Sequence, residues 1–76
     1  MMFLYIPVKE SLYKPETGKY LSFGIKVYSL TERRCSVISS LSDISSSEDF
    51  VSYLALNCTR SQLSPLHLRD IVFDAI

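Results

Sequence analysis

The chain has 76 residues, which is room for one domain, spanning residues 1–76, and not for two. Its hydrophobic content of 47%, with five tyrosines and four phenylalanines, excludes a disordered chain. Eight basic and eight acidic residues cancel, so the basic excess typical of nucleic-acid-binding modules is missing.

The apolar, aromatic-rich segment 2–8 predicts a β-strand. Alternation divides its side chains between two faces, with Met2, Leu4, Ile6 and Val8 on one and Phe3, Tyr5 and Pro7 on the other. Proline has no N–H for a ladder bond, so Pro7 predicts that this strand ends there or lies at a sheet edge. Pro15 and Gly18 then mark a turn.

Residues 20–30 carry the clearest strand pattern of the chain. The alternating apolar positions are Leu21, Phe23, Ile25 and Val27. Gly24, in the middle of this segment, indicates a bulge or the close approach of another backbone. A weaker third strand is expected over residues 34–41, with Cys35, Val37 and Leu41 on one face and Ile38 on the other. The strands are therefore expected within residues 2–41.

Serines and acids precede the next apolar segment and predict a helix over residues 46–58. Ser45 and Glu48 have the spacing of a capping box, and Ser46 or Ser47 is an equally good cap. The apolar stripe of this helix consists of Phe50, Val51, Leu54 and Cys58, with Tyr53 and Leu56 off it.

A second helix is predicted over residues 64–76, because Ser64 is a favoured N-cap and Pro65 suits the first helical position. Helical spacing gathers a core-facing stripe of Leu68, Ile71, Val72, Ala75 and Ile76. Leu66 and Phe73 lie nearly opposite that stripe. Either the helix is wrapped on two sides by sheet or loop, or this apolar pair contacts another molecule, for which a symmetric homodimer is the commonest arrangement.

The polar residues of the same segment are the candidates for chemistry. His67, Asp70 and Asp74 gather on the wet side of the helix as exposed neighbours, where His67 and Asp70 form at most a weak surface pair. Cys58 and His67 form a thiol–imidazole candidate across the interhelical turn. A catalytic triad also needs a nucleophile beside the histidine and a group that orients it, so catalysis is not expected.

Metal, cofactor, membrane and nucleic-acid binding are not expected either. Two cysteines with one histidine match no zinc-ligand spacing. The N-terminus lacks the features of a signal peptide and no segment reaches the length of a membrane span, so we expect a cytosolic protein with reduced thiols. Lys26, Tyr20 and Tyr28 share one strand face and offer a stacking surface for single-stranded nucleic acid, but neutral net charge favours an ordinary half-exposed sheet face.

Two stretches resemble a known family. They are Phe23-Gly24-Ile25, followed by Asp43-Ile44-Ser45, and the closing run Ser64-Pro65-Leu66-His67-Leu68-Arg69-Asp70-Ile71-Val72-Phe73-Asp74. Over residues 20–76 the chain is similar to a family of small proteins of unknown function from clostridia-like Firmicutes. It departs from the family pattern at Phe23, Ile71 and Phe73, where tyrosine, valine and glutamate are usual. The resemblance implies a bacterial cytosolic protein and adds no activity.

These patterns predict an α+β fold with a small antiparallel sheet of three strands, followed by two C-terminal helices packed on one face. The function expected is a non-enzymatic interaction or regulatory module that self-associates or binds another protein, with Leu66 and Phe73 in the interface. The alternatives are a small-ligand or minor enzymatic role around His67, Asp70 and Cys58, and a nucleic-acid accessory role.

Overall fold

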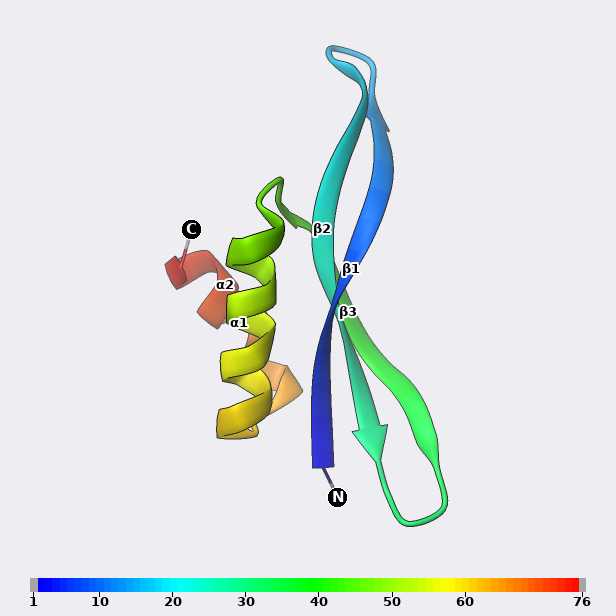
Figure 1. Cartoon of the computed structure of the whole chain (residues 1–76), viewed down its shortest axis with the longest axis vertical. Coiled ribbons are helices and arrows are strands. Elements are labelled where there is room, and N and C mark those ends of the chain that lie inside the picture. The colour runs from blue at the N-terminus through cyan, green and yellow to red at the C-terminus, as the bar shows by residue number, and fades with distance from the viewer. Residues whose placement is uncertain (1, 76) are drawn as a thin grey trace.

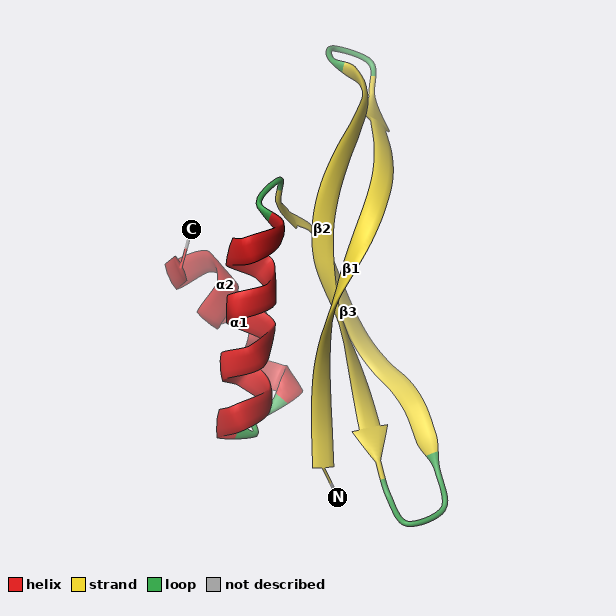
Figure 2. Cartoon of the chain, viewed as in Figure 1, coloured by secondary structure: helices red, strands yellow, loops and turns green. Residues whose placement is uncertain are grey.

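The structure, a computed structural model, describes residues 2–75. Three strands come first and the helices follow (Figure 1). The elements are β1 (Met2–Lys14), β2 (Gly18–Leu30), β3 (Cys35–Ser45), α1 (Glu48–Ser61), the 3₁₀ helix η1 (Pro65–His67) and α2 (Leu68–Ala75). Both α-helices lie on the same side of the sheet (Figure 2). The predicted α+β fold, with three antiparallel strands before two helices, is confirmed.

The sheet is an antiparallel meander in the order β1-β2-β3. Its strands are longer than the sequence pattern predicts: β1 continues beyond Val8 to Lys14, and β3 continues beyond Leu41 to Ser45. The extension of β1 pairs with β2 up to a turn at residues 15–17, where Gly18 adopts a φ of +78°. Leu21, predicted to be buried, is exposed here, although Ile25 and Val27 of the same strand face lie in the core.

Two irregularities separate β3 from a regular ladder. Between the pairs Val27–Ser39 and Tyr28–Val37 the register shifts by one residue, and between Phe23–Ser45 and Ile25–Leu41 it shifts again. An inserted residue turns the following side chains to the opposite face of the sheet. The prediction that Leu41 shares a face with Cys35 and Val37 is therefore wrong, since Leu41 packs against the core on the helix side.

The free edge of β1 is covered by side chains from the end of α1. The Tyr5 N–H donates to Thr59 Oγ1 at 2.9 Å, and the Phe3 N–H donates to Gln62 Oε1 at 2.8 Å. Because these odd-numbered positions point their N–H groups away from β2, Pro7 costs the ladder no bond. The edge position predicted from Pro7 is therefore confirmed, but the strand does not end there.

Ser47 caps the N-terminus of α1, and its Oγ accepts a hydrogen bond from the Phe50 N–H at 3.2 Å. Gln62 caps the C-terminus and adopts the left-handed conformation common after a helix. The buried side chains of α1 join those of β1, β2, β3 and α2 in one core, which consists of Tyr5, Ile25, Val27, Ile44, Val51, Leu54, Ala55, Cys58, Leu68 and Val72. Tyr53 and Leu56 are exposed, as their positions off the predicted stripe require.

The second helical segment differs from the single helix predicted over residues 64–76. A 3₁₀ turn comes first, and the hydroxyl of Ser64 makes no capping hydrogen bond. Only Leu68 and Val72 of the predicted core stripe are buried in α2, whereas Ile71 and Ala75 are exposed. Ile76, the remaining member of that stripe, lies outside the described residues. Two buried side chains therefore anchor this helix.

Candidate functional site

The predicted interface residues Leu66 and Phe73 lie on two different elements at the C-terminal end of the chain. Leu66 belongs to η1 and is 88% exposed, and Phe73 belongs to α2 and is 67% exposed. Within residues 2–75 neither side chain is packed against the core, so wrapping of the helix by sheet or loop does not explain them. We call Leu66, Phe73 and the groove described next the C-terminal surface.

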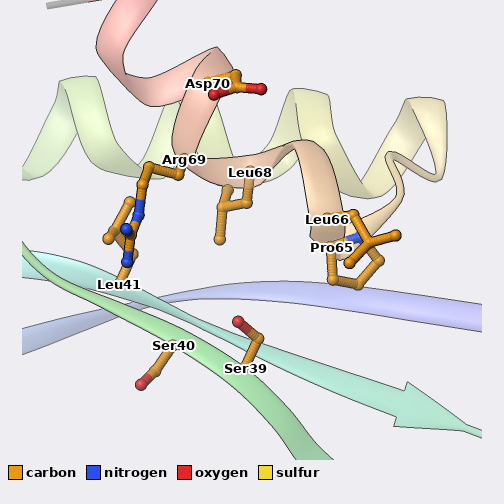
Figure 3. Close-up of a pocket in the computed structure, with 8 residues that line it drawn as sticks. All are labelled: Ser39, Ser40, Leu41, Pro65, Leu66, Leu68, Arg69 and Asp70. Carbon is orange, nitrogen blue, oxygen red and sulfur yellow. The ribbon is translucent and has the colours of Figure 1, made fainter.

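A groove of about 360 Å³ separates the start of α2 from β3. Residues 39–41 form its β3 side, and residues 65, 66 and 68–70 form its helical side. Leu68 and Arg69 point toward the sheet, whereas Asp70 points away from it (Figure 3). The groove is open to solvent and its lining mixes serine hydroxyls, leucines and one guanidinium group. Such a lining suits contact with another polypeptide better than enclosure of a small molecule.

His67, Asp70 and Cys58 do not form a common site. His67 and Asp70 are exposed, and within residues 2–75 no hydrogen bond or ion pair involves either side chain. Cys58 is only 3% exposed, and burial raises the pKa of its thiol, which opposes formation of the reactive thiolate. Cys35 is an exposed free cysteine at the start of β3. Among the described residues no group of three or more His, Cys, Asp and Glu side chains is placed to hold a metal ion.

The sequence analysis missed a polar network on the opposite side of the sheet, which we call the Asp43 cluster. It consists of Glu10, Lys14, Tyr20, Ser22, Ser42 and Asp43. The Glu10 carboxylate accepts hydrogen bonds from the Asp43 N–H at 2.9 Å and from the Ser42 hydroxyl at 2.7 Å. Two bonds from one side chain thus hold the bulged segment of β3 against β1.

The Asp43 carboxylate is the acceptor at the centre of this cluster. Ser22 Oγ donates to it at 2.7 Å and Tyr20 Oη at 2.8 Å, while Lys14 Nζ lies 3.9 Å away. These hydrogen bonds, with Lys14 nearby, lower the pKa of Asp43, and the bond to Asp43 raises the pKa of Tyr20. Tyr20 was predicted as part of a stacking surface for nucleic acid, but its hydroxyl is hydrogen-bonded to Asp43 and lies near Glu10. These two carboxylates would repel the phosphate backbone of a nucleic acid.

Gly24 is the sequence signal that pointed to this cluster. A Cβ at that position would lie 2.5 Å from the Leu41 carbonyl oxygen and 2.7 Å from Glu10 Oε1. Both features predicted from a glycine in mid-strand, the bulge and the close backbone, are confirmed. The bulge also places Asp43 at a φ of +54°. The cluster satisfies the hydrogen-bonding groups of an irregular strand, which is a structural role.

These features define a small α+β protein in which a three-stranded meander carries two helices on one face. His67, Asp70 and Cys58, the residues predicted as candidates for chemistry, do not come together in an enclosed site. Within that class, the chain belongs to a family of unknown function, DUF6514, whose model matches residues 1–76. The resemblance to an uncharacterised family is thereby confirmed. No curated protein and no solved structure matches the chain. No helix within residues 2–75 is long and apolar enough to cross a membrane.

Proposed function

We propose that this protein is a non-enzymatic interaction module that self-associates. The observation that carries the proposal is its excess surface. A folded monomer of 8.7 kDa is expected to expose about 4,700 Å², whereas this chain exposes 5438 Å². The radius of gyration of 13.1 Å also exceeds the value of about 11 Å expected for a compact domain of this length.

Part of this surface is apolar, which gives association a driving force. The exposed large apolar side chains include Leu66 and Phe73 near the C-terminal end of the chain and Met2 and Val37 on the sheet. The core within residues 2–75, with ten buried hydrophobic residues, is small, so burial against another molecule would add to the stability of the fold. The C-terminal surface remains available to a different protein partner.

A catalytic role for His67, Asp70 and Cys58 has less support, because burial separates the thiol from the two exposed polar groups. The two free cysteines agree with the proposal that the protein works in the reducing cytosol. The neutral net charge and the carboxylates of the Asp43 cluster favour a protein partner over nucleic acid.

Sedimentation equilibrium of the full chain, from low micromolar to near-millimolar concentration, tests self-association. The expected result is an average mass that rises with concentration toward twice the 8.7 kDa of the chain. The thermal midpoint is expected to rise over the same range, because dimerisation stabilises the folded state by mass action. A mass that stays at 8.7 kDa throughout contradicts the proposal.

A further inference from the structure

Six of the apolar side chains on the sheet face that faces away from the helices form one group. They are Met2, Leu4, Ile6, Tyr28, Leu30 and Val37, which we call the open patch. Their orientation follows from Tyr5 and Val27, which are cross-strand partners buried under the helices, because neighbouring residues of a strand point to opposite faces. Within residues 2–75, no helix covers this side of the sheet (Figure 2).

The open patch is contiguous across all three strands. Its central row is Leu4, Tyr28 and Val37, which are aligned by the register of both strand pairs. The rows on either side are Met2, Leu30 and Cys35, and Ile6, Lys26 and Ser40. Lys26 is the single charged residue of the nine. By contrast, Leu66 and Phe73 of the C-terminal surface are separated in the chain by Arg69 and Asp70, both exposed.

We propose that the open patch is the contact through which a second copy of this chain packs, sheet against sheet. This inference rests on the proposed self-association and assigns its surface. The exposed area of the whole chain exceeds the expectation for a monomer by about 700 Å², which is of the size, roughly 800 Å², that each partner gives to a standard interface. Packing two sheets face to face adds a second layer to the uncovered side, as in a β-sandwich.

Charge selects the orientation of the two copies. The Asp43 cluster, with two carboxylates and one lysine, lies beyond one end of the open patch. The hairpin tip with Glu32, Arg33 and Arg34, all exposed, lies beyond the other end. On β2, Ser22 precedes Tyr28 by six positions, about 20 Å along the strand, and Arg33 and Arg34 follow Tyr28 by five and six positions. The two ends are thus at comparable sequence distances from the central row.

A two-fold axis that crosses the strands at the central row sets the acidic end of each copy against the arginine tip of its partner. An axis along the strands instead sets acidic end against acidic end, which is repulsive. The charges therefore favour a symmetric dimer in which the strands of the two sheets run in opposite directions. In that arrangement Lys26 lies over the row of Met2, Leu30 and Cys35 of the other copy.

Sedimentation equilibrium on three variants tests the assignment. Val37→Glu places two like charges near the two-fold axis, and the expected result is a dimer dissociation constant raised by about 100-fold or more. Because Val37 is 53% exposed, the monomer is expected to keep its fold and its far-UV circular dichroism. Phe73→Glu is the matched control, an exposed aromatic replaced by the same charge on the helical side, and a change within about twofold is expected.

Lys26→Met gives an effect of the opposite sign and avoids any risk of unfolding. It removes a charge from the proposed contact and is expected to tighten the dimer several-fold. Dissociation by Phe73→Glu, with Val37→Glu and Lys26→Met both without effect, overturns the assignment but leaves self-association intact. A wild-type chain that is monomeric at every concentration overturns both proposals.

Discussion

Side chains alternate between the two faces of the sheet, but the helices cover one face and leave the other exposed. On the covered face, Ile25 and Val27 are completely inaccessible to solvent and belong to the same core as the buried side chains of both helices. On the open face, the neighbouring Lys26 is exposed and Tyr28 is half-buried. Apolar side chains thus line both faces, although the chain supplies helices for one. The proposed contact with a second copy rests on this difference: within residues 2–75 the open face carries apolar side chains but no covering layer.

The two faces also differ in what limits their tolerance to substitution. On the covered face, packing limits which substitutions are tolerated, because every missing methyl group leaves a cavity. Near the Asp43 cluster of the open face, hydrogen bonds and a close backbone contact limit which substitutions are tolerated. On the open patch, the proposed dimer makes tolerance depend on the protein concentration, since a second copy would bury it.

The largest effect on stability is expected from a comparison of two isoleucines on opposite faces of the sheet. Ile25→Ala removes a fully buried side chain and is expected to lower the free energy of unfolding by about 2–5 kcal/mol. Ile6→Ala, on the open patch, is expected to cost far less in the dilute monomer and more at concentrations where the dimer forms. Urea unfolding at two protein concentrations measures both. Equal losses from the two substitutions in the dilute monomer would remove the distinction between the faces.

The close backbone contact at Gly24 gives the next largest effect. Gly24→Ala forces its Cβ against the Leu41 carbonyl oxygen, and a backbone group does not move aside as a flexible side chain does. The expected loss is about 1–3 kcal/mol of unfolding free energy. Gly18→Ala is the control, since it has no heavy atom within 4 Å and only the strain of a positive φ opposes it, about 1–2 kcal/mol. A neutral Gly24→Ala would contradict the close packing of the bulge.

The same bulges mark the limit of what the sequence predicted. Period-two and helical patterns identified the three strands, the first helix and most of its buried stripe, because burial repeats regularly along those segments. Leu41 was assigned to the wrong face because an inserted residue leaves no trace in the apolar pattern. Gly24 indicated the irregularity, but the partners of Asp43 come from Glu10 and Ser22, distant positions that spacing along the chain does not connect.

The second helix shows a different limit. A single helical wheel across residues 64–76 assumes one rotation per residue, but Pro65–His67 form a 3₁₀ turn with a tighter rotation. Within α2, Ile71 was predicted to be in the core and is exposed, since only the narrow side of the helix that carries Leu68 and Val72 is buried. For Leu66 and Phe73 the sequence left two alternatives, wrapping by sheet or loop and contact with another molecule, and within residues 2–75 both side chains are exposed. The open patch was missed, since alternation alone does not tell which face of a strand the helices cover.

On the covered face, Tyr5 provides a test that depends on pH. Its hydroxyl donates to the Leu63 carbonyl, and burial, with a smaller effect of Cys58, raises its pKa to about 12. Since tyrosine in the unfolded chain ionises near pH 10, the stabilisation is complete below about pH 10 and is lost as the pH rises toward about 12. Tyr5→Phe should be less stable than the wild type at neutral pH, by about 1 kcal/mol for the lost hydrogen bond.

The stability of Tyr5→Phe should also fall less steeply above pH 10, and urea midpoints recorded stepwise across that range measure the difference. The thiol of Cys58 and the hydroxyl of Tyr20 also have raised pKa values, but both groups remain in the two proteins and do not affect the comparison. Parallel pH profiles would show that Tyr5 is not buried as described.

The smallest expected effect comes from comparing the serines that precede the two helical segments, Ser47 before α1 and Ser64 before η1. Ser47 caps α1 through its side chain, so Ser47→Ala should lower the free energy of unfolding by about 1 kcal/mol. Ser64 precedes η1 with an extended backbone but makes no side-chain cap, so Ser64→Ala should leave the stability within about 0.5 kcal/mol. Thermal unfolding monitored by circular dichroism compares the two. A loss for Ser64→Ala as large as that for Ser47→Ala would restore the capped helix that the sequence predicts at residues 64–76. Leu66 and Phe73 would then lie on one continuous helix. That outcome would support the C-terminal surface as the dimer contact.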